Sequence, residues 1–208
     1  MNTSKIAMLA IAVAALVLGA PAASAQKTVT ISDRVGKNQF SWTSDAPLEK
    51  IKGTAEGVTG KLTLDPGNIS SIRGTISAQV STMKSGNSTR DGHLKGAQWL
   101  DAAKYPAISF TISSVSNAKT NGNVTTGTAT GQFTMHGVSK TMSIPFKLTY
   151  LTESAKTRER APGDLVMISA DFNVSLADFK VAGGKGAVGS TVGEKIAVTA
   201  QLFGSTGL

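Results

Sequence analysis

The residues with the greatest capacity for chemistry are gathered between positions 90 and 105. Arg90, Asp91 and His93 are close neighbours, and one of the two tryptophans (Trp99) and one of the two tyrosines (Tyr105) follow them. Guanidinium and imidazole groups bind polar and anionic groups through charge-assisted hydrogen bonds, and aromatic rings supply a large apolar contact area. This spacing predicts a site for a ligand with a polar end and an apolar body.

Each of these residues also has a purely structural interpretation. His93 would then hydrogen-bond a carboxylate or a main-chain group, while Arg90 and Asp91 would fix the segment onto the rest of the fold. Trp99 and Tyr105 would act as packing anchors, because large rings usually bury most of their surface. On the residues alone, both interpretations stay open.

Enzymatic chemistry has little support in the residue pattern. The chain contains no Gly-x-Ser-x-Gly nucleophile elbow, and its two His and lack of Cys disfavour a metal site. The glycine-rich run 183–193 lacks the Gly-Lys-Ser/Thr ending of a phosphate-binding loop and is instead typical of a flexible hairpin loop. A hydrolase using Asp91 and His93 is the least favoured class. We expect no catalytic residues, no cofactor and no metal.

The elements that must position the cluster are β-strands. Apolar and polar residues alternate with a period of two, and short turn sequences separate the alternating segments. Short connections imply an antiparallel meander, which loses its free edges when it closes into a barrel. We therefore expect an all-β protein, an antiparallel up-and-down barrel of about eight strands with a short helical insert. The expected strands are residues 28–32, 39–43, 51–64, 72–80, 108–112, 124–135, 142–150, 166–174 and 196–202.

The insert around residues 88–105 predicts one or two short helices. Residues 88–91 have the spacing of a capping box, and Asp91 can pair with Lys95 one helical turn later. Arg90 and His93 share one helical face, and Tyr105 followed by a proline ends the helical segment. Such an insert would lie over one barrel opening as a lid or pack along the side of the barrel.

The inward-facing residues of the expected barrel are apolar and include Phe110, Phe146 and Phe172. A barrel of about eight strands either fills its interior with side chains or holds one slender ligand. An interior of this composition suits a hydrocarbon and not a sugar or a nucleotide. A ligand cavity and a packed core are equally compatible with these residues.

The N-terminus predicts export. Residues 1–25 combine a basic start, an apolar run and small residues before the expected cleavage site, which is the pattern of a secretory signal peptide. Residues 26–208 would then form one domain without disulfides, because the chain has no Cys. The formal net charge of +8 favours an anionic membrane surface as a partner, or solubility alone. Few aromatic residues and scattered basic residues disfavour nucleic acid, and the oligomeric state is left open.

Three segments carry a family resemblance. They are Arg90-Asp-x-His-Leu94 with the following Trp99-Leu-Asp-Ala-Ala-Lys-Tyr-Pro106, Phe133-Thr-Met-His-Gly-Val-Ser-Lys140, and Phe172-Asn-Val-Ser-Leu-Ala-Asp-Phe179. Their order, within a match from about Lys27 to about Phe203, resembles the YceI-like family of bacterial secreted lipid-binding proteins.

The resemblance implies a lipocalin-like barrel that is exported to the periplasm and has no enzymatic activity. Its elongated apolar cavity would accommodate a polyisoprenoid, such as a polyprenyl phosphate or an isoprenoid quinone. Residues 45–60 lack the His and aromatic residues often found near the first family strands, and residues 152–164 form a charged loop. The competing hypothesis is a filled barrel that acts through its basic surface as an envelope stress or structural protein. The candidate ligand contacts are Arg90, Asp91, His93, Trp99, Tyr105, Phe110, Phe146 and Phe172.

Overall fold

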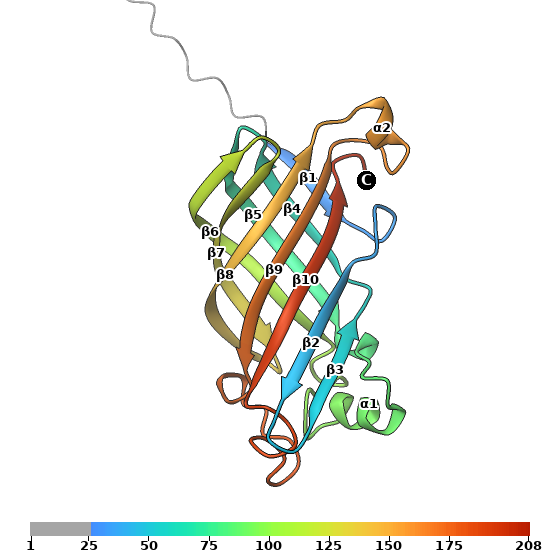
Figure 1. Cartoon of the computed structure of the whole chain (residues 1–208), viewed down its shortest axis with the longest axis vertical. Helices are drawn as coiled ribbons and strands as arrows, with labels where there is room; N and C mark the ends of the chain where they lie inside the picture. Colours follow the sequence, from blue (N-terminus) through green and yellow to red (C-terminus); the bar gives the residue numbers. More distant parts are fainter. Residues whose placement is uncertain (1–25) are drawn as a thin grey trace, which may run out of the picture.

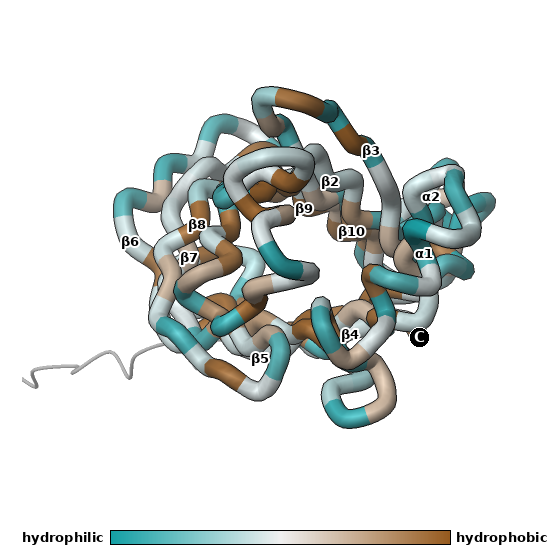
Figure 2. The backbone as a smooth tube through the Cα atoms, turned by 90° about the horizontal axis from the view of Figure 1, so that it is seen from below, coloured by the Kyte–Doolittle hydropathy of each residue, from teal (hydrophilic) through white to brown (hydrophobic). Residues whose placement is uncertain are grey.

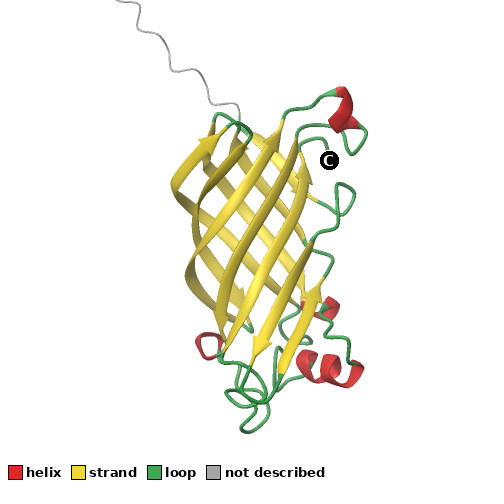
Figure 3. Ribbon diagram, viewed as in Figure 1, coloured by secondary structure: helices red, strands yellow, loops and turns green. Residues whose placement is uncertain are grey.

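The computed structural model describes residues 26–208 of the 208-residue chain. The predicted signal peptide, residues 1–25, lies outside the described residues. The described part is built from strands that follow one another around a single curved sheet, with two short α-helices outside it (Figure 1, Figure 3). The strands are β1 (Lys27–Ile31), β2 (Gln39–Asp45), β3 (Lys50–Ala55), β4 (Thr59–Asp65), β5 (Asn68–Gln79), β6 (Ala107–Asn121), β7 (Val124–Met135), β8 (Val138–Leu151), β9 (Leu165–Ser175) and β10 (Lys195–Ser205), and the helices are α1 (Ser88–Lys95) and α2 (Ala155–Arg158).

These ten strands form a barrel of eight. β1 and β2 lie one after the other along β10, because Ile31 is opposite Gly204 while Gln39 is opposite Gln201. β3 and β4 continue each other in the same way, since β3 pairs with β2 and β4 pairs with β1. All pairs are antiparallel, and the pairing of β1 with β10 closes the sheet. The expected all-β, up-and-down barrel of about eight strands is confirmed.

The expected single strand over residues 51–64 is wrong in one respect, because it is interrupted. Residues 56–58 separate β3 from β4, and Gly57 in this break has a φ of +64°. Left-handed backbone of this kind cannot continue a strand and is most easily adopted by glycine. β3 and β4 are therefore two separate strands and not one continuous strand.

One of the short turns between alternating segments lies at residues 136–137. His136 and Gly137 have φ values of +51° and +72° and join β7 to β8. Positive φ at both central positions is the signature of a two-residue type I′ hairpin turn, whose twist matches that of the flanking strands. The Nδ1 atom of His136 also lies 3.1 Å from the carbonyl oxygen of Phe179, which ties this turn to the segment after β9. His136 therefore has a structural role.

The barrel is filled at the end that carries α2. Large aliphatic side chains from β1, β4 and β8 are fully buried there, among them Val29, Leu62 and Leu148. A buried carboxylate, that of Asp164, lies at the same end and accepts hydrogen bonds from the ammonium of Lys27 and the hydroxyl of Tyr150. Side chains and a polar cluster thus close this end.

The opposite end carries α1 and the rest of the insert. Beyond β5 the chain turns through a 3-10 helix (Val80–Thr82) and passes β3, where Thr54 and Lys84 exchange two main-chain hydrogen bonds of 2.8 and 2.9 Å. After α1 the chain leads into β6. The insert lies beside the lower part of β3, beyond the end of β5 (Figure 1). The view from this end shows the strands arranged as a ring, with apolar positions among those that face its centre (Figure 2).

The helix α1 begins one residue earlier than the capping-box spacing predicts. Asn87 is the N-cap residue, and its side chain accepts a hydrogen bond from the main-chain nitrogen of Arg90 at 3.1 Å. Asn satisfies the free N–H groups of a first helical turn as well as Ser does. The carboxylate of Asp91 accepts hydrogen bonds from Ser85 and takes no part in capping the helix.

Candidate functional site

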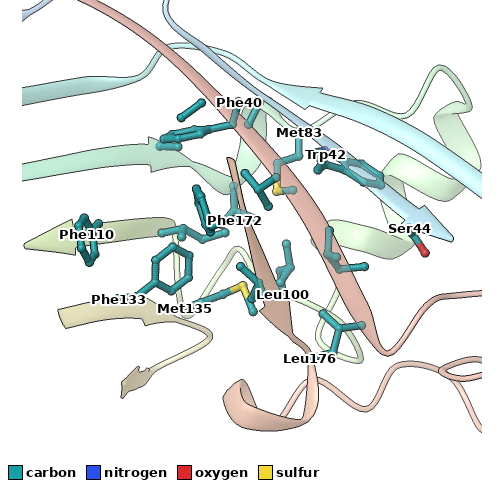
Figure 4. A pocket seen from close by; sticks show the side chains of 18 of the residues that line it. Phe40, Trp42, Ser44, Met83, Leu100, Phe110, Phe133, Met135, Phe172 and Leu176 are labelled. Atoms are coloured by element: carbon teal, nitrogen blue, oxygen red, sulfur yellow. The ribbon is translucent and has the colours of Figure 1, made fainter. Parts of the chain in front are cut away.

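A cavity of about 360 Å³ extends from the α1 end into the interior of the barrel. Its wall is almost entirely aliphatic and aromatic, with side chains from the strands and from the insert (Figure 4). Val29, Leu62 and Leu148, which are fully buried at the α2 end, do not line it, whereas Ile168 and Leu202 of the same core cluster do. The interior is thus packed at one end and hollow at the other, so each of the two sequence-based alternatives describes one half of the barrel.

The aromatic part of the wall comes from the alternation of the strands. Phe110 of β6 is directly opposite Phe133 of β7, and both rings face the interior. The Phe133 ring contacts the Phe172 ring edge to face, with centroids 6.0 Å apart, which is a favourable arrangement for aromatic pairs. Phe146 of β8 also lines the cavity. The three phenylalanines predicted to face the interior do so.

Small side chains leave the space open. Ala170 of β9 is directly opposite Ala200 of β10, and on its other side it faces Phe146 of β8. Ala78 and Ala129 line the same cavity from β5 and β7. Close packing of a barrel this size requires larger inward side chains on at least some of these strands. The alanines are therefore the local reason that this half is hollow.

The polar residues of the wall lie at the rim, beside α1. Arg90 and His93 of α1 line the cavity together with Glu49, which precedes β3. A guanidinium nitrogen of Arg90 lies 2.8 Å from a carboxylate oxygen of Glu49, and both side chains are partly exposed. This ion pair joins the insert to the turn between β2 and β3. The common face predicted for Arg90 and His93 is confirmed by their shared position on the cavity wall.

Asp91 does not line the cavity. Its carboxylate accepts hydrogen bonds from the main-chain nitrogen of Ser85 at 2.7 Å and from the Ser85 hydroxyl at 2.6 Å. The Ser85 hydroxyl holds the pKa of Asp91 below its usual value, because the bond favours the charged form. Asp91 therefore fixes the start of the insert, which is the structural interpretation of this residue.

Tyr105 also lies away from the cavity. Its ring contacts the His136 ring edge to face, with centroids 5.1 Å apart, and it covers Gly137 so closely that a Cβ there would be 2.4 Å from the ring. Tyr105 thus packs on the β7–β8 turn. Six of the eight predicted contact residues line the cavity, and Asp91 and Tyr105 do not.

Trp99 combines packing with a place on the wall. It lines the cavity, and its ring lies over Gly183, where a Cβ would be 2.4 Å from the nearest ring atom. Gly183 also has a φ of +66°, a conformation that favours glycine. The glycine-rich loop before β10 is therefore shaped to accept the Trp99 ring.

Several wall residues were not singled out from the sequence. They include Phe40 and Trp42 of β2, Met83 directly after the 3-10 helix, Leu100 of the insert and Met135 of β7 (Figure 4). The alternation of β2, with Phe40, Trp42 and Ser44 on one face, is the signal that could have found the first two. Met83 and Leu100 lie in irregular chain, where no period tells which side faces inward.

The described residues also bear on metal binding and on membrane insertion. Within residues 26–208, no group of three or more His, Cys, Asp or Glu side chains is arranged to hold a metal ion. In that same part of the chain, no helix has the length and apolar character that a membrane crossing demands.

Comparison with known proteins places this fold. The family model of the YceI-like domain matches residues 23–203. The chain belongs to the YceI-like family. A UPF0312 protein of Pseudomonas putida (strain GB-1) is 30% identical over 190 residues, which are 89% of this chain and 94% of the relative.

Two solved structures have a similar fold. The YCEI protein of Campylobacter jejuni is 20% identical and has a TM-score of 0.62, with 76% of this chain and 86% of that chain covered. A polyisoprenoid binding domain from Saccharophagus degradans is 10% identical and has a TM-score of 0.61, with 85% and 97% covered. The YceI-like barrel is therefore shared even where most residues differ.

Proposed function

We propose that this YceI-like protein is a periplasmic lipid-binding protein that holds an isoprenoid chain in the hollow half of its barrel and catalyses no reaction. The observation that carries the proposal is the cavity of about 360 Å³ with its apolar wall. The polyisoprenoid binding domain of Saccharophagus degradans, which shares the fold, supports the class of ligand. The N-terminal pattern of residues 1–25 supports export to the periplasm.

The wall matches a branched hydrocarbon chain. Burial of apolar surface contributes roughly 25 cal/mol per Å², so a chain enclosed by aliphatic and aromatic side chains gains most of its affinity from contact area. The alternation of alanines with phenylalanines gives the wall recesses and ridges, and the methyl branches of an isoprenoid chain suit such an uneven surface. A filled barrel that acts through its surface alone fits the structure less well, because part of the interior is hollow.

The polar end of the ligand would then lie at the rim, near Arg90 and His93. Both a polyprenyl phosphate and an isoprenoid quinone carry oxygen atoms that accept hydrogen bonds from these side chains. The formal net charge of +8 favours exchange of the ligand with an anionic membrane surface. Trp99, Phe110, Phe146 and Phe172 would contact the apolar part of the ligand.

The direct test is mass spectrometry of organic extracts from the mature protein, purified under mild conditions from the periplasm. We expect a stoichiometric isoprenoid in the extract of the wild-type protein. Ala170→Phe should fill the cavity and remove this lipid while the barrel stays folded, because Ala170 faces the cavity. Ala197→Phe is the matched control, since Ala197 is exposed on the adjacent strand β10.

Two results would contradict the proposal. One is an extract without lipid, together with no rise in melting temperature when isoprenoid quinones or polyprenyl phosphates are added. The other is a lipid that is retained equally by both variants, which would place it on the outside of the barrel. Circular dichroism and melting temperature would establish that each variant is folded.

A further inference from the structure

The cavity ends at a definite level inside the barrel. β8, β9 and β10 are paired in a continuous register, so their inward positions form rows that cross the three strands. Three successive rows, taken towards the α2 end, are Phe146, Ala170 and Ala200; Leu148, Ile168 and Leu202; and Tyr150, Val166 and Gly204. All of the first row lines the cavity, Ile168 and Leu202 of the second row line it, and none of the third row does. Ile168 and Leu202 therefore form the floor of the cavity on these strands.

The floor rests on the packed core. Ile168 and Leu202 are themselves buried, and Val166, directly beyond them on β9, is fully buried. Val29 of β1 and Leu62 of β4 are also fully buried and do not line the cavity. An interior that is packed in this way gives up space only at the cost of strain. A ligand that enters from the α1 end therefore stops at Ile168 and Leu202.

The depth of the cavity can be counted along the strands. Near the mouth, the wall on β9 and β10 includes Val174 and Ile196, which are directly opposite each other. Each of them is six residues from the floor residue of its own strand, which corresponds to about 20 Å at the usual rise of a strand. An extended isoprene unit adds four carbon–carbon bonds and thus about 5 Å. The depth therefore matches about four isoprene units.

The volume of the cavity sets a tighter limit. The cavity holds about 360 Å³. A carbon atom with its hydrogens fills about the same 30 Å³ as a water molecule in the liquid. The cavity therefore has room for about twelve carbon atoms, which is between two and three isoprene units of five carbons each.

We propose that this cavity accepts about three isoprene units of a lipid tail, and that Ile168 and Leu202 set this limit. The inference rests on the proposed function and adds to it the length of chain that is recognised. A longer isoprenoid binds through its terminal units and leaves the others outside the mouth. Units that stay in water in both the free and the bound ligand add nothing to the affinity.

The test compares three isoprenoid alcohols that differ by one unit each. Geraniol, farnesol and geranylgeraniol have two, three and four units and the same hydroxyl end, and the fluorescence of Trp42 and Trp99, which both line the cavity, reports their binding. We expect farnesol to bind about tenfold or more tightly than geraniol, because its third unit is buried. Geranylgeraniol should bind less than about threefold more tightly than farnesol, because its fourth unit stays outside.

A deeper floor should move this limit. Leu202→Ala and Ile168→Ala each remove three carbons, so the double variant makes room for about one further unit. We expect this variant to bind geranylgeraniol about tenfold more tightly than farnesol. Ile196→Ala is the matched control, because it enlarges the cavity near the mouth on the same strand as Leu202. The control should leave the relative affinities of the three alcohols unchanged.

A raised floor gives an independent variant. Large-to-small substitutions in a core can unfold a protein, whereas Ala200→Leu adds carbons to existing space one row above the floor. This variant should weaken the binding of farnesol about tenfold and leave the binding of geraniol nearly unchanged, because two units still fit above the new side chain. Circular dichroism and melting temperature would establish that each variant is folded. If the double variant does not fold, the wild-type series and Ala200→Leu decide.

The outcomes separate the length limit from the proposed function. If the gain in affinity from farnesol to geranylgeraniol equals the gain from geraniol to farnesol in the wild-type protein, the limit is wrong while the lipid-binding function stands. Equal weakening of all three alcohols by Ala200→Leu leads to the same conclusion. If none of the three alcohols binds the wild-type protein, the proposed function fails and the inference fails with it.

Discussion

Arg90 and Glu49 form an ion pair, with 2.8 Å between a guanidinium nitrogen and a carboxylate oxygen, and both side chains border the cavity. The pair connects α1 with the turn that precedes β3, two segments that are far apart in the sequence. It also means that the guanidinium at the rim is already neutralised before any ligand arrives. An anionic headgroup must therefore compete with Glu49 for Arg90.

Glu49→Gln should favour anionic ligands. Removal of the carboxylate leaves Arg90 free to pair with a phosphate, so binding of farnesyl phosphate should tighten several-fold relative to farnesol, as measured by isothermal titration calorimetry. Loss of this partly exposed pair should cost less than about 1 kcal/mol of stability. Asp45→Asn is the matched control, because it breaks an exposed pair with Lys50 outside the cavity. An equal gain in both variants would show that overall charge, and not Arg90, is responsible.

Asp164→Asn should destabilise the closed end of the barrel. The Asp164 side chain is 5% exposed and accepts hydrogen bonds from Lys27, Tyr150 and the main-chain nitrogen of Glu153. We expect a loss of about 2–3 kcal/mol in the free energy of unfolding by urea, because charged hydrogen bonds and an ion pair are weakened together. Asp171→Asn, which alters an exposed carboxylate bonded to Thr199, should cost less than about 0.5 kcal/mol.

The same carboxylate contributes to stability in acid. Burial raises the pKa of Asp164, but the bonds from Lys27 and Tyr150 outweigh it, and the net pKa lies below the usual value. The contribution is thus present above about pH 4, the value for an unfolded chain, and is lost as the pH falls through the lower pKa of the folded state. Asp164→Asn should flatten this acid dependence. An unchanged acid limb in the variant would assign the dependence to other carboxylates.

Tyr150 should make the protein sensitive to alkali. Burial, together with the neighbouring Asp164 carboxylate, raises the pKa of Tyr150 well above its ordinary value. Its contribution is complete below about pH 10, where tyrosine in the unfolded chain ionises, and declines as the pH rises further. The free energy of unfolding should therefore fall as the pH rises above about 10, and Tyr150→Phe should reduce this fall. Tyr105→Phe makes the same chemical change where the ring packs on the β7–β8 turn, and it serves as the control.

Gly183→Ala should loosen the insert from the loop before β10. The new Cβ would be 2.4 Å from the Trp99 ring, and the φ of +66° at this position is unfavourable for alanine. We expect a loss of about 1–3 kcal/mol and a red shift of tryptophan fluorescence as Trp99 gains contact with water. Gly184→Ala is the neighbouring control, because a Cβ there meets no atom within 4 Å. Equal effects of the two substitutions would point to chain stiffness and not to the Trp99 contact.

Much of the fold follows from the sequence because alternation is a direct record of which face a strand buries. The barrel and the inward phenylalanines are both read from that period. The break between β3 and β4 also has a signal in the sequence. The buried apolar positions change from odd numbers (Ile51, Ala55) before Gly57 to even numbers (Leu62, Leu64) after it. The N-cap residue is Asn87 and not the predicted Ser88, because both residue types are good N-caps.

The site is only partly predictable for a related reason. Arg90 and His93 are found because a helix of known period puts them on one face. Asp91 and Tyr105 are polar or aromatic residues in the same segment, and their partners, Ser85 and Gly137, are fixed by tertiary contacts that the sequence does not display. The sequence also does not reveal that the buried Nε1–H group of Trp42 has no acceptor within residues 26–208, because the tertiary fold determines which groups surround the ring.

The packed end of the barrel also determines the direction in which a lipid can travel. Val29, Leu62 and Leu148 block the interior beyond the cavity, so a chain that enters from the α1 end meets a dead end and cannot pass through. A lipid held there inserts its tail first and leaves with its polar end leading. Loading and unloading of the barrel must therefore both take place at the α1 end. A donor and an acceptor of the lipid cannot occupy that end at the same time.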